Sequence, residues 1–247
     1  MAGLIIDWKV EVGIMPEGNR MKRRILHTSD WHLQSMGDKA CQSIDSLISL
    51  ANEVEVDLVV IVGDLFDDNR VEDELVSFTI EQLRRFQAGV VILPGNHDCL
   101  IRTSVFERPG FWNEDDNIRL FRSPNGELLD YPDLGISLWG KSIDTYENDV
   151  KPMVGIPHPE RNGRWHIALA HGYYVGAEAP LFPSYHITRE EIVNSGWDYI
   201  ALGHLINFRC VCEEPMACYS GSPSLTSTVV VVDFDDEKGI QITPRSI

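Results

Sequence analysis

Five short runs place metal-binding or proton-transferring side chains directly after an apolar stretch. The runs are Asp-Trp-His at 30–32, Gly-Asp at 63–64, Gly-Asn-His-Asp at 95–98, His-Gly at 171–172 and Gly-His at 203–204. Carboxylate, imidazole and amide-oxygen donors suit manganese, iron or zinc, and no thiolate is required. These residue types therefore predict a divalent-metal centre.

Each candidate ligand taken singly also has a purely structural explanation. Asp30 could cap a helix, Asp64 and Asp67 could be solvated loop carboxylates, and His171 could be a hydrogen-bonded core histidine. In open α/β sheets, however, the carboxyl ends of the strands meet at one edge of the sheet. Five such endings in order along one chain therefore favour a shared metal site over five unrelated structural roles.

The elements that would position these runs follow a strand and helix alternation. Strands are expected at 25–29, 57–62, 89–93, 136–139, 165–170 and 198–202, and a C-terminal hairpin at 228–234 and 239–243. Helices are expected from two apolar stripes, formed by Ala40, Ile44, Leu47, Ile48 and Ala51, and by Leu75, Val76, Ile80, Leu83 and Phe86. A capping box at Thr188 predicts a third, short helix. This rhythm indicates an α/β fold with parallel strands.

With these motifs in place, the chain resembles the calcineurin-like metallophosphoesterases. The family pattern D-x-H, G-D-x-x-D, G-N-H-[D/E], H and G-H-x-H is followed from about residue 24 to 225. The runs at 27–33 and 220–223 are similar to the SbcD- and Mre11-type branch of DNA-repair nucleases. The resemblance implies a four-layer α-β-β-α sandwich, in which two mixed sheets are flanked by helices.

The resemblance also implies a role for each motif residue. The implied ligands are Asp30 and His32 for a first metal, Asp64 as a bridge, and Asn96, His171 and His204 for a second metal. His97 would stay off the metals and face the scissile phosphate, and Asp67 would hydrogen-bond its ring and orient it. A metal-activated hydroxide would attack phosphorus in line.

One ligand position departs from the family pattern. Ile206 stands where G-H-x-H has its second histidine, which normally completes the shell of the first metal. Two divalent ions are expected, manganese above all with iron or zinc as alternatives, and the first site is expected to be weak. A water or a neighbour such as Asn207 could fill the gap.

The net charge of −17 bears on the substrate, because such a field repels a polyanion. The leading hypothesis is a hydrolase of small phosphate esters, above all phosphodiesters. Two alternatives stay open: an SbcD/Mre11-like DNA exonuclease or endonuclease, and a catalytically degenerate scaffold, which Ile206 motivates. The sequence does not determine the substrate or the oligomeric state.

Cysteine usage and hydropathy bear on location. The five cysteines are an odd number and no secretory signal opens the chain, so reduced thiols in a cytoplasmic protein are expected. No apolar run approaches the roughly 20 residues that span a bilayer, so no membrane association is expected. Residues 1–20 are expected to be an N-terminal extension or an edge strand, and residues 21–247 the phosphoesterase domain.

Overall fold

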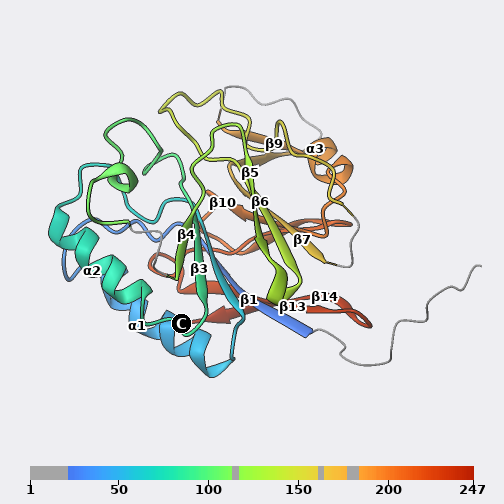
Figure 1. Cartoon of the computed structure of the whole chain (residues 1–247), viewed down its shortest axis with the longest axis horizontal. Coiled ribbons are helices and arrows are strands. Elements are labelled where there is room, and N and C mark those ends of the chain that lie inside the picture. The colour runs from blue at the N-terminus through green and yellow to red at the C-terminus, as the bar shows by residue number, and fades with distance from the viewer. Residues whose placement is uncertain (1–21, 113–116, 161–163, 177–183) are drawn as a thin grey trace, which may run out of the picture.

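The computed structural model describes residues 22–112, 117–160, 164–176 and 184–247, so the segment expected as an extension at 1–20 lies outside them. Two six-stranded sheets form the centre of the molecule (Figure 1). The first sheet has the order β14 (Gly239–Ser246), β13 (Thr228–Asp235), β1 (Lys22–Thr28), β2 (Leu58–Val62), β3 (Gly89–Leu93) and β4 (Ile118–Leu120). The second has the order β11 (Arg209–Glu213), β12 (Met216–Tyr219), β10 (Tyr199–Gly203), β7 (Trp165–His171), β6 (Ile136–Gly140) and β5 (Glu127–Tyr131).

Both sheets are mixed, as the family resemblance implies. In the first sheet β1, β2, β3 and β4 run parallel, β13 pairs with β1 in the antiparallel sense, and β14 pairs with β13 in the antiparallel sense. In the second sheet β6, β7, β10 and β12 run parallel, whereas β5 and β11 are antiparallel edges. Of these parallel strands, the alternating pattern predicts β1, β2, β3, β6, β7 and β10 but not β4 or β12. The carboxyl ends of β1, β2, β3, β7 and β10 carry the chemical runs.

The strand β2 shows why its sequence is continuously apolar. All five of its residues are buried. Val59 and Ile61 belong to the core between the first sheet and its helices, and the alternate residue Val60 belongs to the core between the two sheets. Successive side chains of a strand point to opposite faces, so a strand with a covered layer on each side needs apolar residues at every position.

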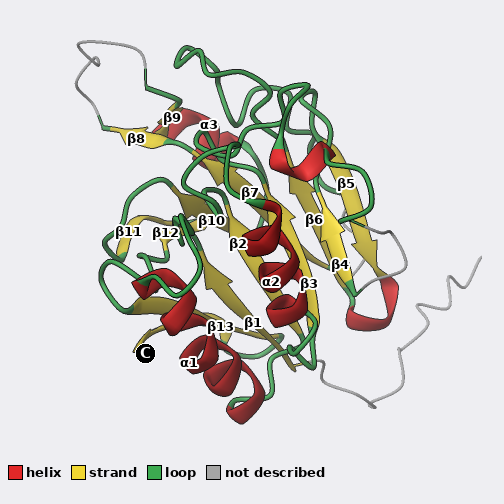
Figure 2. Cartoon of the chain, turned by 90° about the vertical axis from the view of Figure 1, so that its left-hand side faces the viewer, coloured by secondary structure: helices red, strands yellow, loops and turns green. Residues whose placement is uncertain are grey.

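Helices cover the outer faces of the two sheets unequally. α1 (Lys39–Glu53) and α2 (Asp73–Leu83) lie against the first sheet (Figure 2). The second sheet carries α3 (Arg189–Asn194), which begins with the capping box expected at Thr188, and the short parallel pair β8 (Tyr173–Val175) and β9 (His186–Thr188). The four-layer α-β-β-α arrangement is therefore confirmed, with a fourth layer made largely of loops.

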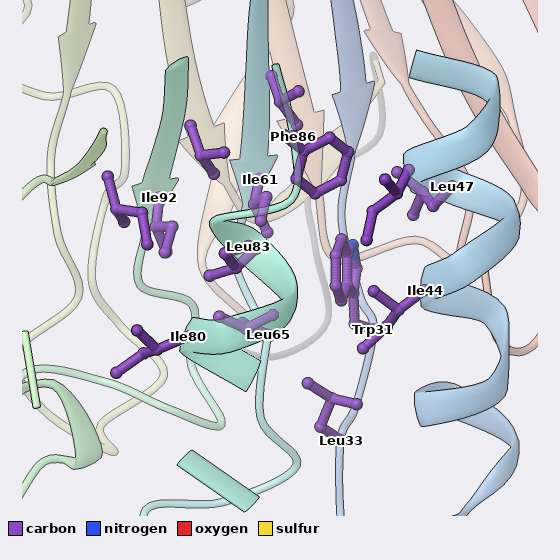
Figure 3. Packing of buried hydrophobic residues seen from close by; sticks show 14 of the residues in the cluster. Trp31, Leu33, Ile44, Leu47, Ile61, Leu65, Ile80, Leu83, Phe86 and Ile92 are labelled. Atoms are coloured by element: carbon purple, nitrogen blue, oxygen red, sulfur yellow. The ribbon is translucent and has the colours of Figure 1, made fainter. Parts of the chain in front are cut away.

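The packing of Trp31 determines how the first metal-binding run is presented. Trp31 follows β1 and is buried near Ile44 and Leu47 of α1 (Figure 3). Its indole Nε1 donates a hydrogen bond of 2.9 Å to Thr28 Oγ1. A large apolar side chain between Asp30 and His32 thus ties this loop to the helix layer.

The prediction that the cysteines are reduced thiols is wrong for one pair. Cys210 on β11 and Cys218 on β12 form a disulfide, with Cα atoms 3.9 Å apart, and only Cys41, Cys99 and Cys212 are free. The two residues face one another in the antiparallel ladder, a pairing that sequence spacing alone did not reveal. The reduced-thiol argument for a cytoplasmic location therefore no longer holds.

In the described part of the chain, no helix combines the length and apolar character needed to cross a membrane.

Candidate metal centre

Residues far apart in the sequence meet at the carboxyl ends of β1, β2, β3, β7 and β10. The amide of Asp30 donates to Gly63 O and that of His32 to Asp64 O, each at 3.0 Å, which joins the loops after β1 and β2. The amide of His204 donates to Asp30 Oδ2 at 3.0 Å across 174 positions, which joins the two sheets. The convergence expected from strand topology is thus present.

One cluster of candidate ligands brings together Asp64, Asn96, His171 and His204. His171 Nε2 lies 3.2 Å from Asp64 Oδ2 and 2.9 Å from Asn96 Oδ1. His204 Nδ1 lies 3.0 Å from the same Asn96 oxygen and 3.3 Å from His171 Nε2. His171 Nδ1 donates to Val62 O at 2.9 Å, which directs Nε2 toward the other donors.

A second cluster brings together Asp30, His32 and Asp64. His32 Nε2 lies 3.9 Å from Asp30 Oδ1 and 3.9 Å from Asp64 Oδ2. Within each cluster, one ligand atom from each carboxylate and imidazole lies within 4.8 Å of the others. The carboxylate of Asp64 belongs to both clusters, which is the arrangement that a bridging ligand between two ions requires.

The backbone of the site departs from ordinary conformations. Asp30, His32, Asp64 and His204 have φ of 55°, 51°, 53° and 101°, in the left-handed half that residues with a Cβ rarely adopt. Such conformations persist only where the surrounding structure enforces them, and they concentrate at functional sites. The strand ends therefore turn sharply enough to direct these side chains into one small volume.

Glycines leave the room that the clusters occupy. A Cβ on Gly63 would lie 1.9 Å from His171 Nδ1, and one on Gly95 would lie 2.1 Å from Asp64 Oδ1. A Cβ on Gly203 would lie 1.8 Å from Val62 O. All three contacts are far shorter than any real Cβ contact, so a side chain at any of these positions would displace the atoms of the site.

Burial and mutual charge shift the acid–base behaviour of the cluster. Burial opposes the protonation of His171, but the charge of Asp64, its hydrogen bond to His171 and the charge of Asp30 together outweigh burial and raise the pKa of His171 to about 9. Burial raises the pKa of Asp30. Burial also acts to raise the pKa of Asp64, but the charge and hydrogen bond of His171, together with the charges of His97 and His32, outweigh it and depress that pKa. Burial and the charge of His171 lower the pKa of His204 to about 4. Strongly shifted groups that converge in this way mark a functional site.

The environment of His97 differs in one respect from the expectation that the side chain of Asp67 hydrogen-bonds its ring. Its Nδ1 donates to the backbone carbonyl of Asp67 at 2.8 Å, and lies 3.8 Å from the Asp67 carboxylate. That carboxylate accepts instead from His32 Nδ1, at 2.9 Å. The His97 side chain is 43% exposed and its ring lies 4.8 Å from that of His32, so it borders the centre and remains accessible.

Three residues that support the site were not assigned roles from the sequence. Asp98 is fully buried, accepts hydrogen bonds from the amides of Gly95 and Phe66, and has its pKa raised to about 7 by burial and the charge of Asp64. Ser222 Oγ donates to Asp30 O at 2.6 Å, and Ser224 Oγ donates to Trp31 O at 2.9 Å. Two signals in the sequence could have identified these residues. Asp98 is the fourth residue of the Gly-Asn-His-Asp run, and the Ser-Gly-Ser-Pro run at 220–223 contains Ser222 and directly precedes Ser224.

Ile206 lies on the loop beyond His204. Its side chain is 38% exposed. Its carbonyl accepts hydrogen bonds from the Ser222 amide at 3.0 Å and from Thr226 Oγ1 at 2.7 Å, which fix the loop. Among the residues that the structure describes, no group of converging carboxylate, imidazole or thiolate donors includes one from 205–208.

Comparison with known proteins agrees with the fold and the donor set. Together these define a metallophosphoesterase. The model of the calcineurin-like phosphoesterases matches residues 23–207, and the chain belongs to this family. The family and the two donor clusters indicate a metal-dependent phosphoesterase that binds divalent ions.

Curated relatives are longer than this chain. It is 27% identical over 224 residues to the metallophosphoesterase YhaO of Bacillus subtilis, and covers 52% of it. It is 26% identical over 243 residues to the SbcD subunit of the SbcCD nuclease from the same organism, and covers 61% of it. These alignments include 80% and 81% of the present chain. The chain thus spans between half and two thirds of the length of these relatives.

Solved structures share the fold at low sequence identity. The protein TT1561 of Thermus thermophilus superposes with a TM-score of 0.59 at 11% identity, covering 90% of this chain and 98% of that one. A purple acid phosphatase from yellow lupin seeds superposes with a TM-score of 0.53 at 13% identity, covering 92% of this chain and 52% of that one. At these identities the similarity establishes the architecture alone.

Proposed function

We propose that the protein is a phosphodiesterase that hydrolyses small phosphate diesters with two divalent ions, manganese in preference. The observation that carries the proposal is the carboxylate of Asp64, which lies 3.2 Å from His171 in one donor cluster and 3.9 Å from His32 in the other. One shared carboxylate between two convergent donor sets fits a pair of ions about 3.5–4 Å apart.

The donors divide between the two ions. Asp30 and His32 would hold the first ion, Asp64 would hold both, and Asn96, His171 and His204 would hold the second. When bound, the ions supply positive charge for the phosphate oxygens and make a water acidic enough to act as nucleophile near neutral pH. The side chains orient the donors: Val62 O fixes the His171 ring and Asp67 fixes the His32 ring.

His97 is proposed as the proton donor to the leaving oxygen. It converges with His32 and Asp67 in a third group of potential donors, beside the two clusters that share Asp64, and its exposed ring is accessible to a substrate. Its Nδ1 is occupied by Asp67 O, so Nε2 is the atom left to face the ester. Asp67 acts on His97 through its backbone and on the first ion through His32.

A nuclease is the second candidate function. The similarity to the SbcD subunit of the SbcCD nuclease favours this function, because the alignment extends over 243 residues. The net charge of −17 opposes it, because a polyanion must approach against that field. A small diester meets far less repulsion than DNA does.

Turnover by the full chain tests the proposal. After metal analysis, bis(p-nitrophenyl) phosphate, p-nitrophenyl phosphate and single-stranded DNA are offered with manganese, iron or zinc. Faster turnover of the diester than of the monoester, lost in His97→Ala and kept in the loop control His158→Ala, supports the proposal. Preferential DNA cleavage whose KM rises steeply with salt supports the nuclease. Turnover of no substrate with any metal leaves the scaffold alternative.

A further inference from the structure

A disulfide joins the two strands at one edge of the second sheet. β11 is the edge strand and pairs antiparallel with β12 (Figure 2). The register places Cys210 opposite Cys218 near the open end of this hairpin, and Glu213 opposite Met216 beside its turn. The disulfide therefore crosslinks the hairpin near the end where the chain enters and leaves it.

The chain enters the hairpin from a loop of the metal centre. This loop lies between β10 and β11 and begins at His204, a candidate ligand of the second ion, whose amide donates to Asp30 Oδ2 at 3.0 Å. Farther along the loop, Ile206 O accepts from the Ser222 amide at 3.0 Å. The entering loop is thus bound both to the centre and to the segment that leaves the hairpin.

The chain leaves the hairpin through residues that hold two further loops of the centre. The hydroxyl of Tyr219, the last residue of β12, donates to Gly172 O at 2.7 Å, beside His171. Ser222 Oγ donates to Asp30 O at 2.6 Å. Both Tyr219 and Ser222 are fully buried. The position of β12 therefore affects the backbone of Asp30 and the backbone next to His171.

The ladder between β11 and β12 is interrupted next to the disulfide. Its register shifts between Cys210 and Cys212, as at a β-bulge, which leaves a residue unpaired. In the described part of the chain β11 has no strand on its outer side, and Arg209 and Cys210 are exposed. The covalent bond therefore supplies a constraint that the interrupted ladder lacks.

We propose that the disulfide Cys210–Cys218 is a site of redox modification that regulates ion binding, an inference that rests on the metal centre of the proposed function. A thiolate of a dithiol reductant attacks Sγ of the exposed Cys210, the S–S bond breaks, and Cys218 leaves and takes up a proton. The second thiol of the reductant then displaces Cys210. The reductant becomes a disulfide, and two electrons and two protons pass to the protein.

Reduction is expected to loosen the centre without unfolding the domain. The open end of the hairpin can then separate locally, because an edge strand beside a bulge has few other constraints. Partners that orient metal ligands are worth about 10–100-fold in metal affinity. Tyr219 and Ser222 act in this way on the loops of His171 and Asp30, so we expect manganese to bind about tenfold more weakly to the reduced protein.

The test compares the oxidised and reduced full chain. Dithiothreitol reduces the protein and is removed under nitrogen, and thiols counted in denaturant should rise from three to five. Calorimetry should then show manganese binding about tenfold weaker, and oxidised glutathione should restore it. The metal-free reduced protein should unfold about 5–10 °C lower. Amide hydrogen exchange should quicken at 204–209 and 220–226 and stay unchanged in β2.

Cys210→Ser leaves Cys218 as a free thiol, as reduction does. This variant should have the manganese affinity of the reduced wild type and should not respond to dithiothreitol. Cys212→Ala is the matched control, because Cys212 lies on the same strand outside the disulfide, and it should respond as the wild type does.

Three results would overturn the redox site and leave the phosphodiesterase proposal standing. They are manganese affinity within about twofold in the two redox states, five thiols that persist after treatment with oxidised glutathione, and a Cys210→Ser variant that still responds to dithiothreitol. Absence of manganese binding in both redox states would overturn the metal centre and the redox site together.

Discussion

The carboxylate of Asp67 accepts a hydrogen bond from His32 Nδ1 at 2.9 Å and lies farther, at 3.8 Å, from Nδ1 of His97. The family pattern attributes to this aspartate a role on the histidine that faces the substrate. In this structure the side chain orients a candidate ligand of the first ion, and the backbone orients His97. Metal affinity and proton transfer are therefore separable by mutation.

Replacing Asp67 with asparagine should weaken first-ion binding by about 10–100-fold, because the ring of His32 loses its anionic partner. His97→Ala should leave manganese affinity within about twofold of the wild type but lower kcat by about 10²–10⁴-fold. Calorimetric manganese titration and turnover of a chromogenic diester measure the two effects. Equal loss of manganese affinity in both variants would refute this division of roles.

Gly203→Ala should disrupt the centre, since its Cβ would lie 1.8 Å from the Val62 carbonyl. We expect a loss of at least about 1–3 kcal/mol of unfolding free energy together with weakened metal binding. Gly176→Ala is the matched control, because no atom of the described residues lies within 4 Å of a Cβ there. Urea unfolding of both variants measures the difference, and similar midpoints for the two would show that the site tolerates the crowding.

Ile206→His should strengthen first-ion binding, because it restores the second histidine of the G-H-x-H pattern on an exposed loop position. A gain of about tenfold or more in manganese affinity is expected, with little change at the second ion. Ile206→Gln controls for polarity without adding an imidazole. An unchanged affinity in the histidine variant would mean that another group already completes the shell.

Chelation of divalent ions should destabilise the protein and abolish its turnover. At a free manganese concentration about 100-fold above Kd, binding contributes about 2.7 kcal/mol of stability. Thermal unfolding with and without chelator measures this contribution, and added manganese should restore both properties. Asp64→Asn, which removes the shared carboxylate charge, should respond far less. An identical response of this variant would place the ions elsewhere.

Stability should fall as the solution becomes more acidic than about pH 6.5, through His27. Burial lowers the pKa of His27 from 6.5 to about 3, while its Nδ1 stays 2.8 Å from the Tyr199 hydroxyl. Between these two pKa values the unfolded chain binds a proton that the folded chain does not, so each pH unit removes about 1.4 kcal/mol. His27→Gln should flatten the acid limb of the stability curve, measured by urea unfolding at several pH values. Parallel stability curves for the wild type and His27→Gln would mean that other titrating groups cause the loss of stability in acid.

Local periodicity in the sequence was enough to establish several parts of this protein. The apolar faces of α1 and α2, the continuous apolar run of β2 and the capping box at Thr188 each appear in the structure as the pattern predicts. Phe86 is buried as expected but follows α2 instead of lying within it. The order of strand endings also predicted the gathering of the six candidate ligands, because parallel strands bring their carboxyl ends to one edge.

Contacts between distant segments became visible only in the folded chain. The partner of the Asp67 carboxylate follows from sub-ångström placement of two loops, which no spacing rule encodes. The cross-strand disulfide of Cys210 and Cys218 depends on ladder register. Periodicity reports which face of an element is buried, whereas the identity of its neighbour is set by how whole layers pack against each other.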